Sequence, residues 1–344
     1  MSVAPILLPT GQSIGAGRTF VIAEVGSNHA TSLETALASI AAAAETGADA
    51  VKFQSIDLDE LYHRPSDFTR GLHAKIDMPE AWHEPLKKCC ADHGLAFLSS
   101  PTYLRAIDVL ESVDAALYKL ASAQVAVFPQ LVQRVASLDK PVILSTGLVT
   151  QDELDRVVKI FKDAGNEKFI ILHCNSVYPA GPEIVHLPRM GDHARRYDCL
   201  VGFSDHTTTN NAAVVAVAMG ASVIERHFTL SRDLDSPDAP LSLEPGEFKA
   251  FVDAVREAEM LCRPSPRSIL EPDEAGFKGR IQHCLVATRP IAVGDVLNDG
   301  NTLLKRGNTG TGVDAWAVFD NACIKAVRAI ETGTWVQPED VAFS

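Results

Sequence analysis

The chain lacks the sequence features that mark several broad protein classes. No hydrophobic run approaches the roughly 20 residues that a transmembrane helix needs. The N-terminal residues, MSVAPILLPTGQS, have neither the basic segment nor the long apolar segment of a signal peptide. The seven cysteines are odd in number and contain no CxxC pair, which argues against a disulfide framework and against a zinc ribbon. We therefore expect a cytoplasmic protein with reduced thiols and no membrane partner.

Positive charge is also scarce. The 344 residues contain 31 Lys and Arg against 44 Asp and Glu, and the formal net charge is -13. Because a nucleic-acid backbone calls for a basic protein face, this balance disfavours nucleic acid as a partner. It does not exclude small anionic ligands, since a few local cations can bind those. Hydrophobic residues make up 46% of the chain, which predicts a large folded core.

What the chain does have is a recurring pattern of short apolar runs, most of them followed by a stretch with helical spacing. The runs are Phe20–Val25, Ala50–Phe53, Ala96–Ser99, Leu117–Leu120, Val142–Ser145, Phe169–His173, Leu200–Phe203 and Ser222–Glu225. Buried strands that alternate with helices are typical of a parallel sheet. Eight such units predict a (β/α)8 TIM barrel over residues 1–262, with a doubly wound sheet as the competing architecture.

The pattern changes after the helical stretch 246–261. Residues 263–279 are rich in Pro and in charge, which predicts a linker. From residue 280 to residue 344, short apolar runs alternate with Gly, Asp and Asn turns, as in a small, mostly β domain. A piece of this size buries little core alone, so we expect it to dock on the barrel or on a second subunit.

Polar residues lie where a barrel carries its chemistry, at the C-terminal ends of the strands. Polar side chains follow or end most of the runs, most of them ionisable or hydroxyl groups, namely Glu24, Lys52, Ser99, Ser100, Lys119, Ser145, Thr146, His173, Asn175, Ser176, Ser204, Asp205, His206, Glu225 and His227. A charge in an apolar strand is costly unless it is paired or ligand-bound. For Lys52 and Lys119 we consider two explanations, a bound phosphate-carboxylate anion or internal salt bridges to Glu24 and Glu225.

Two histidines predict a metal site. His206 and His227 end adjacent strands, and two imidazoles there could bind one divalent ion with positions left for water and a substrate oxygen. His29 is a third candidate ligand or a loop histidine. Asp238, in the segment SPDAP, either hydrogen-bonds a polyol or forms a plain turn.

Ten stretches, in order along nearly the whole chain, resemble the sialic acid synthase family, which includes N-acetylneuraminate, legionaminate and pseudaminate synthases. They are IAEVGSNH, GADAVKFQ, FLSSP, YKLAS, KPVILSTG, LHCNSVYPA, GFSDHT, GASVIERHFTL, SPDAPLSLEP and LLKRGNTGTG. The resemblance implies a barrel followed by an antifreeze-like (SAF) domain, arranged as a domain-swapped homodimer. It also implies a reaction in which phosphoenolpyruvate condenses with an open-chain amino-sugar aldehyde to give a nonulosonate.

In that reaction, as the resemblance implies it, a divalent ion polarises the aldehyde, which C3 of phosphoenolpyruvate attacks. Water then adds at C2, and phosphate leaves by C–O cleavage. The ion would be Mn2+, with Mg2+ or Co2+ as alternatives, held by His206 and His227. The family's phosphoenolpyruvate ligands match Lys52, Lys119, Asn175, Ser176 and Ser204. Its proton-transferring carboxylates match Glu24 and Glu225. Its other substrate-binding positions match Gln124, Tyr178, Asp238 and Arg306. In the family, the arginine at the position of Arg306 reaches into the partner's site and binds the N-acetyl group.

Four departures from the family pattern lie on the sugar side. Gln124 stands after YKLAS where the family has Glu, and Val177 replaces the Glu of HCTSEYP. Where the family has the sequence NHNG, residues 28–31 of this chain are NHAT. Where the family has Pro-Asp-His followed by a downstream Lys, residues 237–240 are PDAP. We therefore hypothesise the same reaction on an acceptor with a less polar or differently substituted end.

Two other functions are compatible with these residues. One is a 3-deoxy-ulosonate synthase acting on a phosphorylated sugar. It needs an extra basic site, and Arg64, Arg70 and Lys75 either supply that site or form a solvated segment. The other is a degenerate barrel that binds a sugar without catalysis. Gln124 favours the second alternative, whereas the retained lysines and histidines disfavour it.

Overall fold

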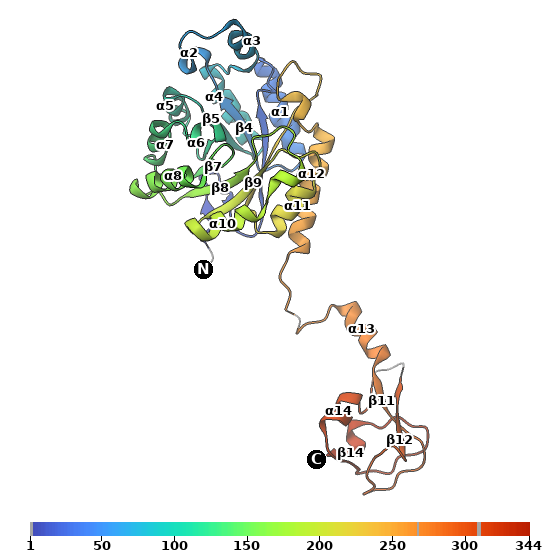
Figure 1. The fold of residues 1–344 in the computed structure, drawn as a ribbon. Helices are drawn as coiled ribbons and strands as arrows, with labels where there is room; N and C mark the ends of the chain where they lie inside the picture. The colour runs from blue at the N-terminus through green and yellow to red at the C-terminus, as the bar shows by residue number, and fades with distance from the viewer. Residues whose placement is uncertain (1–2, 267, 308–310) are drawn as a thin grey trace. The chain divides into compact units, whose positions relative to one another are not determined.

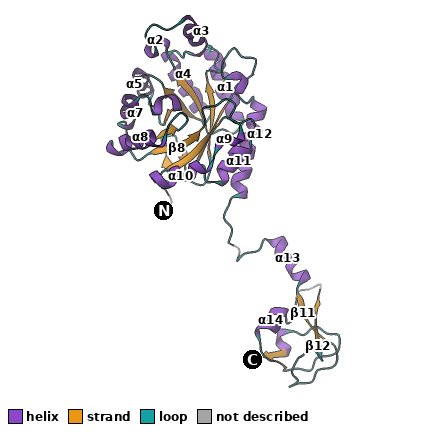
Figure 2. Ribbon diagram, viewed as in Figure 1, coloured by secondary structure: helices purple, strands orange, loops and turns teal. Residues whose placement is uncertain are grey.

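The structure, a computed structural model, describes residues 3–266, 268–307 and 311–344. The chain divides into two compact units, Met1–Arg263 and Pro264–Ser344. The first unit has eight parallel strands at its centre and helices around them (Figures 1 and 2). Within the described residues, no helix combines the length and the apolar composition needed to cross a bilayer.

All eight predicted strands are present. They are β3 (Phe20–Gly26), β4 (Ala50–Ser55), β5 (Ala96–Pro101), β6 (Tyr118–Leu120), β7 (Val142–Ser145), β8 (Phe169–Cys174), β9 (Leu200–Asp205) and β10 (Val223–His227). The first of them, β3, pairs in parallel with the last, β10, with Glu24 opposite His227. Because an open doubly wound sheet does not join its first and last strands in this way, the predicted TIM barrel is confirmed. The hydrogen-bonded order runs β5-β4-β3-β10-β9-β8-β7-β6, so β5 and β6 flank the seam of the barrel.

The helices of the first unit follow the strands in alternation. They are α1 (Leu33–Glu45), α2 (Leu58–Leu61), α3 (Asp67–Ile76), α4 (His83–Asp92), α5 (Leu104–Ser112), α6 (Ser122–Val125), α7 (Pro129–Ala136), α8 (Gln151–Asp163), α9 (Pro182–Val185), α10 (Pro188–Tyr197), α11 (Asn211–Ala218) and α12 (Pro245–Leu261). Two 3-10 turns add to them, η1 (Glu80–Trp82) and η2 (Ala239–Leu241). Local signals set the helix starts; Thr150 and Glu153, for example, form a capping box at α8.

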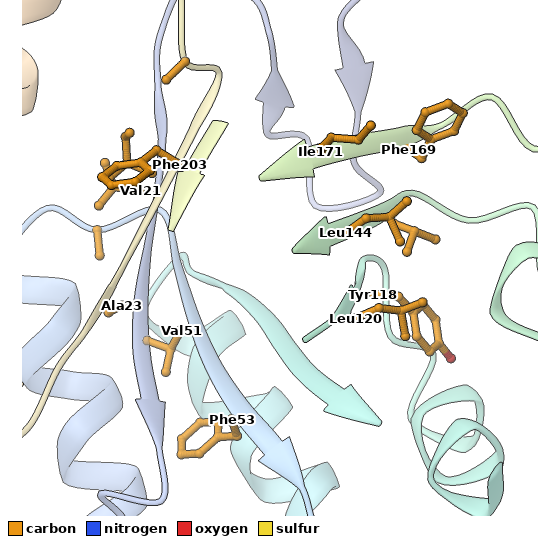
Figure 3. Packing of buried hydrophobic residues seen from close by; sticks show 14 of the residues in the cluster. Val21, Ala23, Val51, Phe53, Tyr118, Leu120, Leu144, Phe169, Ile171 and Phe203 are labelled. Carbon is orange, nitrogen blue, oxygen red and sulfur yellow. The ribbon is translucent and has the colours of Figure 1, made fainter. Parts of the chain in front are cut away.

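Alternate residues of each strand point to opposite faces of the sheet. One set, including Val21, Ala23, Val51 and Phe53, belongs to the large core cluster that also contains the apolar faces of the surrounding helices (Figure 3). The other set fills the barrel and forms a second, smaller apolar cluster with Phe20, Ile22, Leu98, Leu117, Ile143 and Ile170.

A hairpin that was not predicted completes this second cluster. Its strands, β1 (Ile6–Leu7) and β2 (Ser13–Ile14), pair antiparallel, and Leu8 and Ile14 are both buried against the barrel interior. We call this apolar cluster the barrel floor. Because the N-terminal halves of the strands supply it, the polar residues of the C-terminal halves share the opposite end of the barrel.

The second unit has its own small apolar core, built around Leu285, Ile291, Ile324 and Val336. Its elements are α13 (Pro272–Ile281), β11 (His283–Ala287), β12 (Thr302–Arg306), α14 (Ala315–Asp320), β13 (Ile324–Ala326), η3 (Pro338–Asp340) and β14 (Val341–Phe343). Two antiparallel strand pairs form its sheets. Helix α13 overlaps most of the second half of the segment 263–279 that we expected to be a linker.

Candidate active site

Four charged side chains from four strands meet inside the barrel, directly above the floor. Lys52 Nζ on β4 lies 2.7 Å from Oε2 of Glu24 on β3 and 3.8 Å from Oε1 of Glu225 on β10. Lys119 Nζ on β6 lies 3.0 Å from Oε1 of the same Glu225. All four side chains are buried, the most exposed being Glu225 at 6%. The salt bridges that the sequence offered as one explanation for the lysines are therefore present, and we call these residues the charge cluster.

The two carboxylates of the charge cluster differ in their surroundings. Burial raises the pKa of Glu24 to about 7, although the ammonium of Lys52 opposes the shift. Burial acts on Glu225 in the same direction, but the ammonium groups of Lys119 and Lys52 outweigh it and lower the pKa to about 2. Glu225 is thus a permanent anion, whereas Glu24 exchanges its proton near neutral pH, as a general acid or base requires.

The two predicted metal ligands lie side by side above the charge cluster. The ring centroids of His206 and His227 are 5.6 Å apart. His206 Nδ1 lies 2.7 Å from the backbone oxygen of Asn175, an arrangement in which Nδ1 donates and Nε2 is left to bind an ion. His227 Nδ1 is buried and has no hydrogen-bond partner among the described residues. Burial lowers the pKa of His227 to about 4, so the ring is neutral at neutral pH, as a metal ligand must be.

These features fit a divalent ion held by two imidazoles, with the remaining positions open to water and substrate. Within the residues that the structure describes, no cluster of three or more His, Cys, Asp or Glu side chains has the arrangement of a metal site. His29 instead accepts a hydrogen bond at Nδ1 from the backbone N–H of Thr31 and packs edge-on against Trp82. His29 Nε2 is also buried without a hydrogen-bond partner in the described chain, so both roles that the sequence left open for His29 stay open.

The uncharged residues that the sequence singled out line the same end of the barrel. Ser204 donates to Oε1 of Glu225 at 3.3 Å. Asn175 donates from Nδ2 to the oxygen of Ile184, and its Oδ1 is buried without a partner in the described chain. Tyr178 packs on His206, with ring centroids 4.2 Å apart. Ser176 lies close to Gly147, where an added Cβ would stand 2.3 Å from its Oγ.

Asp238 lies against the end of β3. Its Oδ2 accepts hydrogen bonds from the backbone N–H and the hydroxyl of Ser27, at 3.1 and 2.7 Å. Burial would raise the pKa of Asp238, but His227 and the bonds from Ser27 outweigh it and lower the pKa. Gly26 leaves room for this contact, since its φ is +54° and an added Cβ would stand 2.7 Å from Oδ2 of Asp238.

Two groups of predicted residues belong to other segments of the chain. Arg306 belongs to the second unit, where it is exposed on β12 opposite His283. The basic residues considered for an acceptor phosphate lie beyond β4, where Lys75 is paired with Asp235.

Sequence reasoning missed two residues that contact the site, Gln54 and Cys174, whereas it had named Ser100 among the polar residues at the strand ends. Gln54 donates to Oε1 of Glu24 at 2.8 Å, and Ser100 Oγ lies 3.5 Å from Lys52 Nζ. Cys174 Sγ lies 3.9 Å from Nδ1 of His206. Gln54 and Cys174 follow the predicted runs by one residue, so a strand extended with period 2 would have found them.

A cavity of about 270 Å³ opens beside the two histidines, with Tyr178 and Arg226 also in its wall. The guanidinium of Arg226 is already bound, because Nη1 donates to Oδ2 of Asp205 at 2.8 Å. Arg226 therefore adds little free positive charge to the wall of this cavity.

Comparisons with known proteins agree on one family. The profile of the NeuB family matches residues 39–264. The chain is 36% identical over 307 residues to a pseudaminic acid synthase of Campylobacter jejuni, covering 85% of this chain and 88% of that protein. It is 30% identical over 335 residues to an N-acetylneuraminate-9-phosphate synthase of Mus musculus, covering 94% and 92%. A crystal structure of N-acetylneuraminic acid (sialic acid) synthetase from Leptospira borgpetersenii superimposes with a TM-score of 0.74 at 27% identity, covering 81% of this chain and 96% of that one.

Proposed function

Because the chain belongs to the NeuB family of sialic-acid-type synthases, it is a phosphoenolpyruvate-condensing transferase, and we propose that it joins phosphoenolpyruvate to an amino-sugar aldehyde. The product would be a nonulosonate. The observation that carries the proposal is the charge cluster: two lysines, each 2% exposed, lie inside the barrel at the end that bears the histidines. A binding protein without chemistry has no need of such an arrangement, because buried ion pairs are at best weakly stabilising.

The lysines would bind the carboxylate and phosphate of phosphoenolpyruvate, together with Asn175, Ser176 and Ser204. With Glu24 protonated and Glu225 ionised, the cluster has one positive charge more than negative charges. An anionic substrate therefore favours the protonated form of Glu24, which then holds a proton close to the reacting carbons.

The condensation needs one proton transfer at each stage. A bond forms between C3 of phosphoenolpyruvate and the aldehyde carbon, and the aldehyde oxygen takes the proton that we assign to Glu24. Water then adds at C2, its proton returning to a carboxylate. The C2–O bond to phosphate breaks last, as the C2 hydroxyl gives up its proton to the leaving phosphate, which leaves a ketone at C2 and inorganic phosphate. Glu225, as a permanent anion, would stabilise positive charge at C2.

We assign His206 and His227 to a divalent cation, with Mn2+ first and Mg2+ or Co2+ as alternatives. When bound, the cation would polarise the aldehyde carbonyl. Tyr178, which packs on His206, would restrict the ring to one orientation, and Asp238 would contact the hydroxyl groups of the sugar.

We further propose that the second unit is an antifreeze-like (SAF) domain and that the protein is a domain-swapped homodimer. In that assembly Arg306, an exposed arginine on a unit with a small core, would enter the partner's site and bind the N-acetyl group. We place the protein in the cytoplasm, where its seven free cysteines would stay reduced.

A phosphorylated acceptor remains the second candidate, because the mouse relative's name refers to a 9-phosphate product. The basic residues proposed for it give little support. Lys75 is neutralised by Asp235, and both side chains are well exposed to solvent.

The direct test is phosphate release from phosphoenolpyruvate and Mn2+ in the presence of a panel of aldoses. Wild-type protein should release phosphate with one class of amino sugar, and His206→Ala should not. The matched control is His93→Ala, an exposed histidine after α4, which should behave as wild type. Absence of phosphate release with amino sugars, neutral sugars and sugar phosphates alike would overturn the proposal.

A further inference from the structure

One buried arginine connects the two strands that carry the proposed metal ligands. Arg226 follows Glu225 and precedes His227 on β10. In the ladder it lies opposite Asp205, which directly precedes His206 at the end of β9. The side chains of Arg226 and Asp205 are 4% and 0% exposed. Because alternate residues of a strand point to opposite faces of the sheet, Arg226 lies on the face away from His227, toward the surrounding helices.

The guanidinium of Arg226 makes three hydrogen bonds around the end of β9. Nη1 donates to Oδ2 of Asp205 and to the backbone oxygen of Thr209, both at 2.8 Å. Nη2 donates to the backbone oxygen of Thr207 at 2.5 Å. The other carboxylate oxygen of Asp205 accepts from the backbone N–H of Thr207 at 2.8 Å. Arg226 therefore binds the chain on both sides of His206, and we call Arg226, Asp205, Thr207 and Thr209 the arginine clamp.

The segment held by the arginine clamp has no regular secondary structure of its own. Residues 206–209 lie between β9 and α11, so no helix or strand ladder holds their carbonyl groups. The backbone oxygen of His206 accepts from the N–H of Ala180 at 2.8 Å, which fixes one point of the segment. A chain held at one point can still rotate about it. The clamp removes that freedom and so places the backbone of His206, whose ring is then oriented by its bond to Asn175.

Helix α12 supports the guanidinium from the outer side. Cζ of Arg226 lies 5.2 Å from the ring centroid of Phe251, which is fully buried. A guanidinium is planar, so it packs on an aromatic face and donates to several acceptors around its edge. A lysine ammonium is a compact point charge on a flexible stem and cannot reproduce this fork. The clamp therefore depends on arginine and not only on a positive charge.

We infer that Arg226 is a positioning residue for the metal site, which sets the place of His206 relative to His227. The ring centroids of the two histidines are 5.6 Å apart, and the clamp connects the strand of one to the segment of the other. Residues that orient metal ligands typically change metal affinity by about 10- to 100-fold when they are substituted. The inference rests on the proposed function, because it requires that the histidines bind a divalent cation.

The sign of the effect separates positioning from simple electrostatics. A positive charge near a cation site opposes binding of the cation, so loss of the Arg226 charge alone would strengthen binding of Mn2+. The carboxylate of Asp205, no longer neutralised, would add to that attraction. If the clamp positions the histidines, the same substitution should weaken binding instead.

Calorimetric titration of the metal-free, full-length protein with Mn2+ is the test. Arg226→Lys and Arg226→Met should each raise the Kd for Mn2+ by about 10- to 100-fold. The Kd for phosphoenolpyruvate without metal should stay close to that of wild type, because the lysines of the charge cluster lie inside the barrel. Saturating Mn2+ should restore most of the phosphate release. If Arg226→Met does not fold, Arg226→Lys decides, since it keeps a cation beside Asp205.

Arg256→Met is the matched control. Arg256 also joins a carboxylate to a backbone oxygen, because Nη2 donates to Oδ2 of Asp49 at 2.8 Å and Nη1 to the oxygen of Thr19 at 2.7 Å. Thr19 and Asp49 directly precede β3 and β4, at the floor end of the barrel and away from the histidines. This variant should lower the urea midpoint of unfolding without changing the Kd for Mn2+.

Four outcomes would count against these assignments. Unchanged or tighter Mn2+ binding in Arg226→Lys would overturn the inference. Equal losses of affinity for Mn2+ and for phosphoenolpyruvate would overturn it too, because they would indicate a general loss of structure. Wild-type protein that binds no Mn2+ would overturn the metal assignment and the inference with it. Binding of Mn2+ without phosphate release from any aldose would overturn the proposed function alone.

Discussion

Lys119 donates from Nζ to both carboxylate oxygens of Glu225, at distances of 3.0 and 3.1 Å. The pair connects β6 and β10 across the interior of the barrel. Both side chains are almost completely buried. Burial lowers the pKa of Lys119 more than Glu225 raises it, so the ammonium depends on this carboxylate for its charge.

Lys119→Met should therefore lower the free energy of unfolding by about 3–5 kcal/mol, because Glu225 keeps only the longer contact to Lys52 and the hydrogen bond from the neutral Ser204. The double variant Lys119→Met/Glu225→Leu should recover most of that loss, since no unpaired charge remains. Both variants should be inactive. Urea denaturation measures the stabilities. A double variant no more stable than the single one would show that the unpaired carboxylate is not the cause.

A methyl group at Gly26 tests the packing of Asp238 against β3. Gly26→Ala would place a Cβ 2.7 Å from Oδ2 of Asp238 and 3.2 Å from Oε1 of Glu24. We expect phosphate release to fall about 10- to 100-fold, because a displacement of about 1 Å at a reacting group has an effect of this size.

The matched control for this change is Gly17→Ala. Gly17 also has a positive φ, +88°, but nothing lies within 4 Å of its Cβ position. Both substitutions should destabilise the fold by about 1–2 kcal/mol through the backbone alone. Only Gly26→Ala should lose activity; equal activity in the two variants would contradict the assigned position of Asp238.

The raised pKa of Glu24 predicts a pH-dependent stability. From a pH of 4.5, the ordinary value, to about 7, the folded protein keeps a proton on Glu24 that the unfolded chain has lost. The contribution of Glu24 to stability is therefore present at low pH and decreases as the pH rises through this window. Glu24→Gln does not titrate. Its stability relative to wild type should increase from about pH 5 to about pH 8.

Thermal unfolding without substrate or metal, at a series of pH values, measures this difference. The exposed Glu257→Gln is the control and should show a flat difference across the same range. A flat difference for Glu24→Gln as well would mean that its proton is lost at the ordinary pH.

Mixing of two inactive variants tests whether Arg306 of one protomer enters the active site of its partner. Lys119→Met and Arg306→Ala should each be inactive with an amino-sugar acceptor. If the two residues meet at a site built from different subunits, random mixing after dissociation should restore about a quarter of the wild-type activity. No recovery on mixing, with exchange of subunits shown by mass, would contradict the domain-swapped arrangement.

The barrel could be predicted from sequence because each strand is a buried run bounded by turn residues. The C-terminal ends were less predictable. The run Leu200–Phe203 continues to Asp205 in β9, since polar side chains extend a strand when they point into a shared site. The hairpin of β1 and β2 was missed because strands of two residues show no periodicity. Helix α13 had recognisable signals, with Pro272 at its start, Asp273 and Glu274 in its first turn and basic residues in its last.

The candidate site was predictable in composition but not in pairing. The sequence indicated that Lys52 and Lys119 need anionic partners, and it named the right glutamates as one alternative. It could not show that Glu225 forms ion pairs with both lysines whereas Glu24 pairs with Lys52 alone. Among the described residues, the buried hydroxyl of Tyr103 has no hydrogen-bond partner. The sequence carried no signal for this, because the lack of a partner depends on residues distant in sequence.

The barrel floor also constrains the order of events. Leu8 and Ile14 belong to the apolar cluster at one end of the barrel, and Lys119 lies only two residues beyond Leu117, a member of that cluster. Ligands must therefore enter and leave through the other end, where the histidines lie. Whatever binds the lysines is the deeper of two substrates sharing one entrance. A sugar already in place would block the way to them, so the kinetics should be ordered, with phosphoenolpyruvate binding first and excess sugar acting as a dead-end inhibitor.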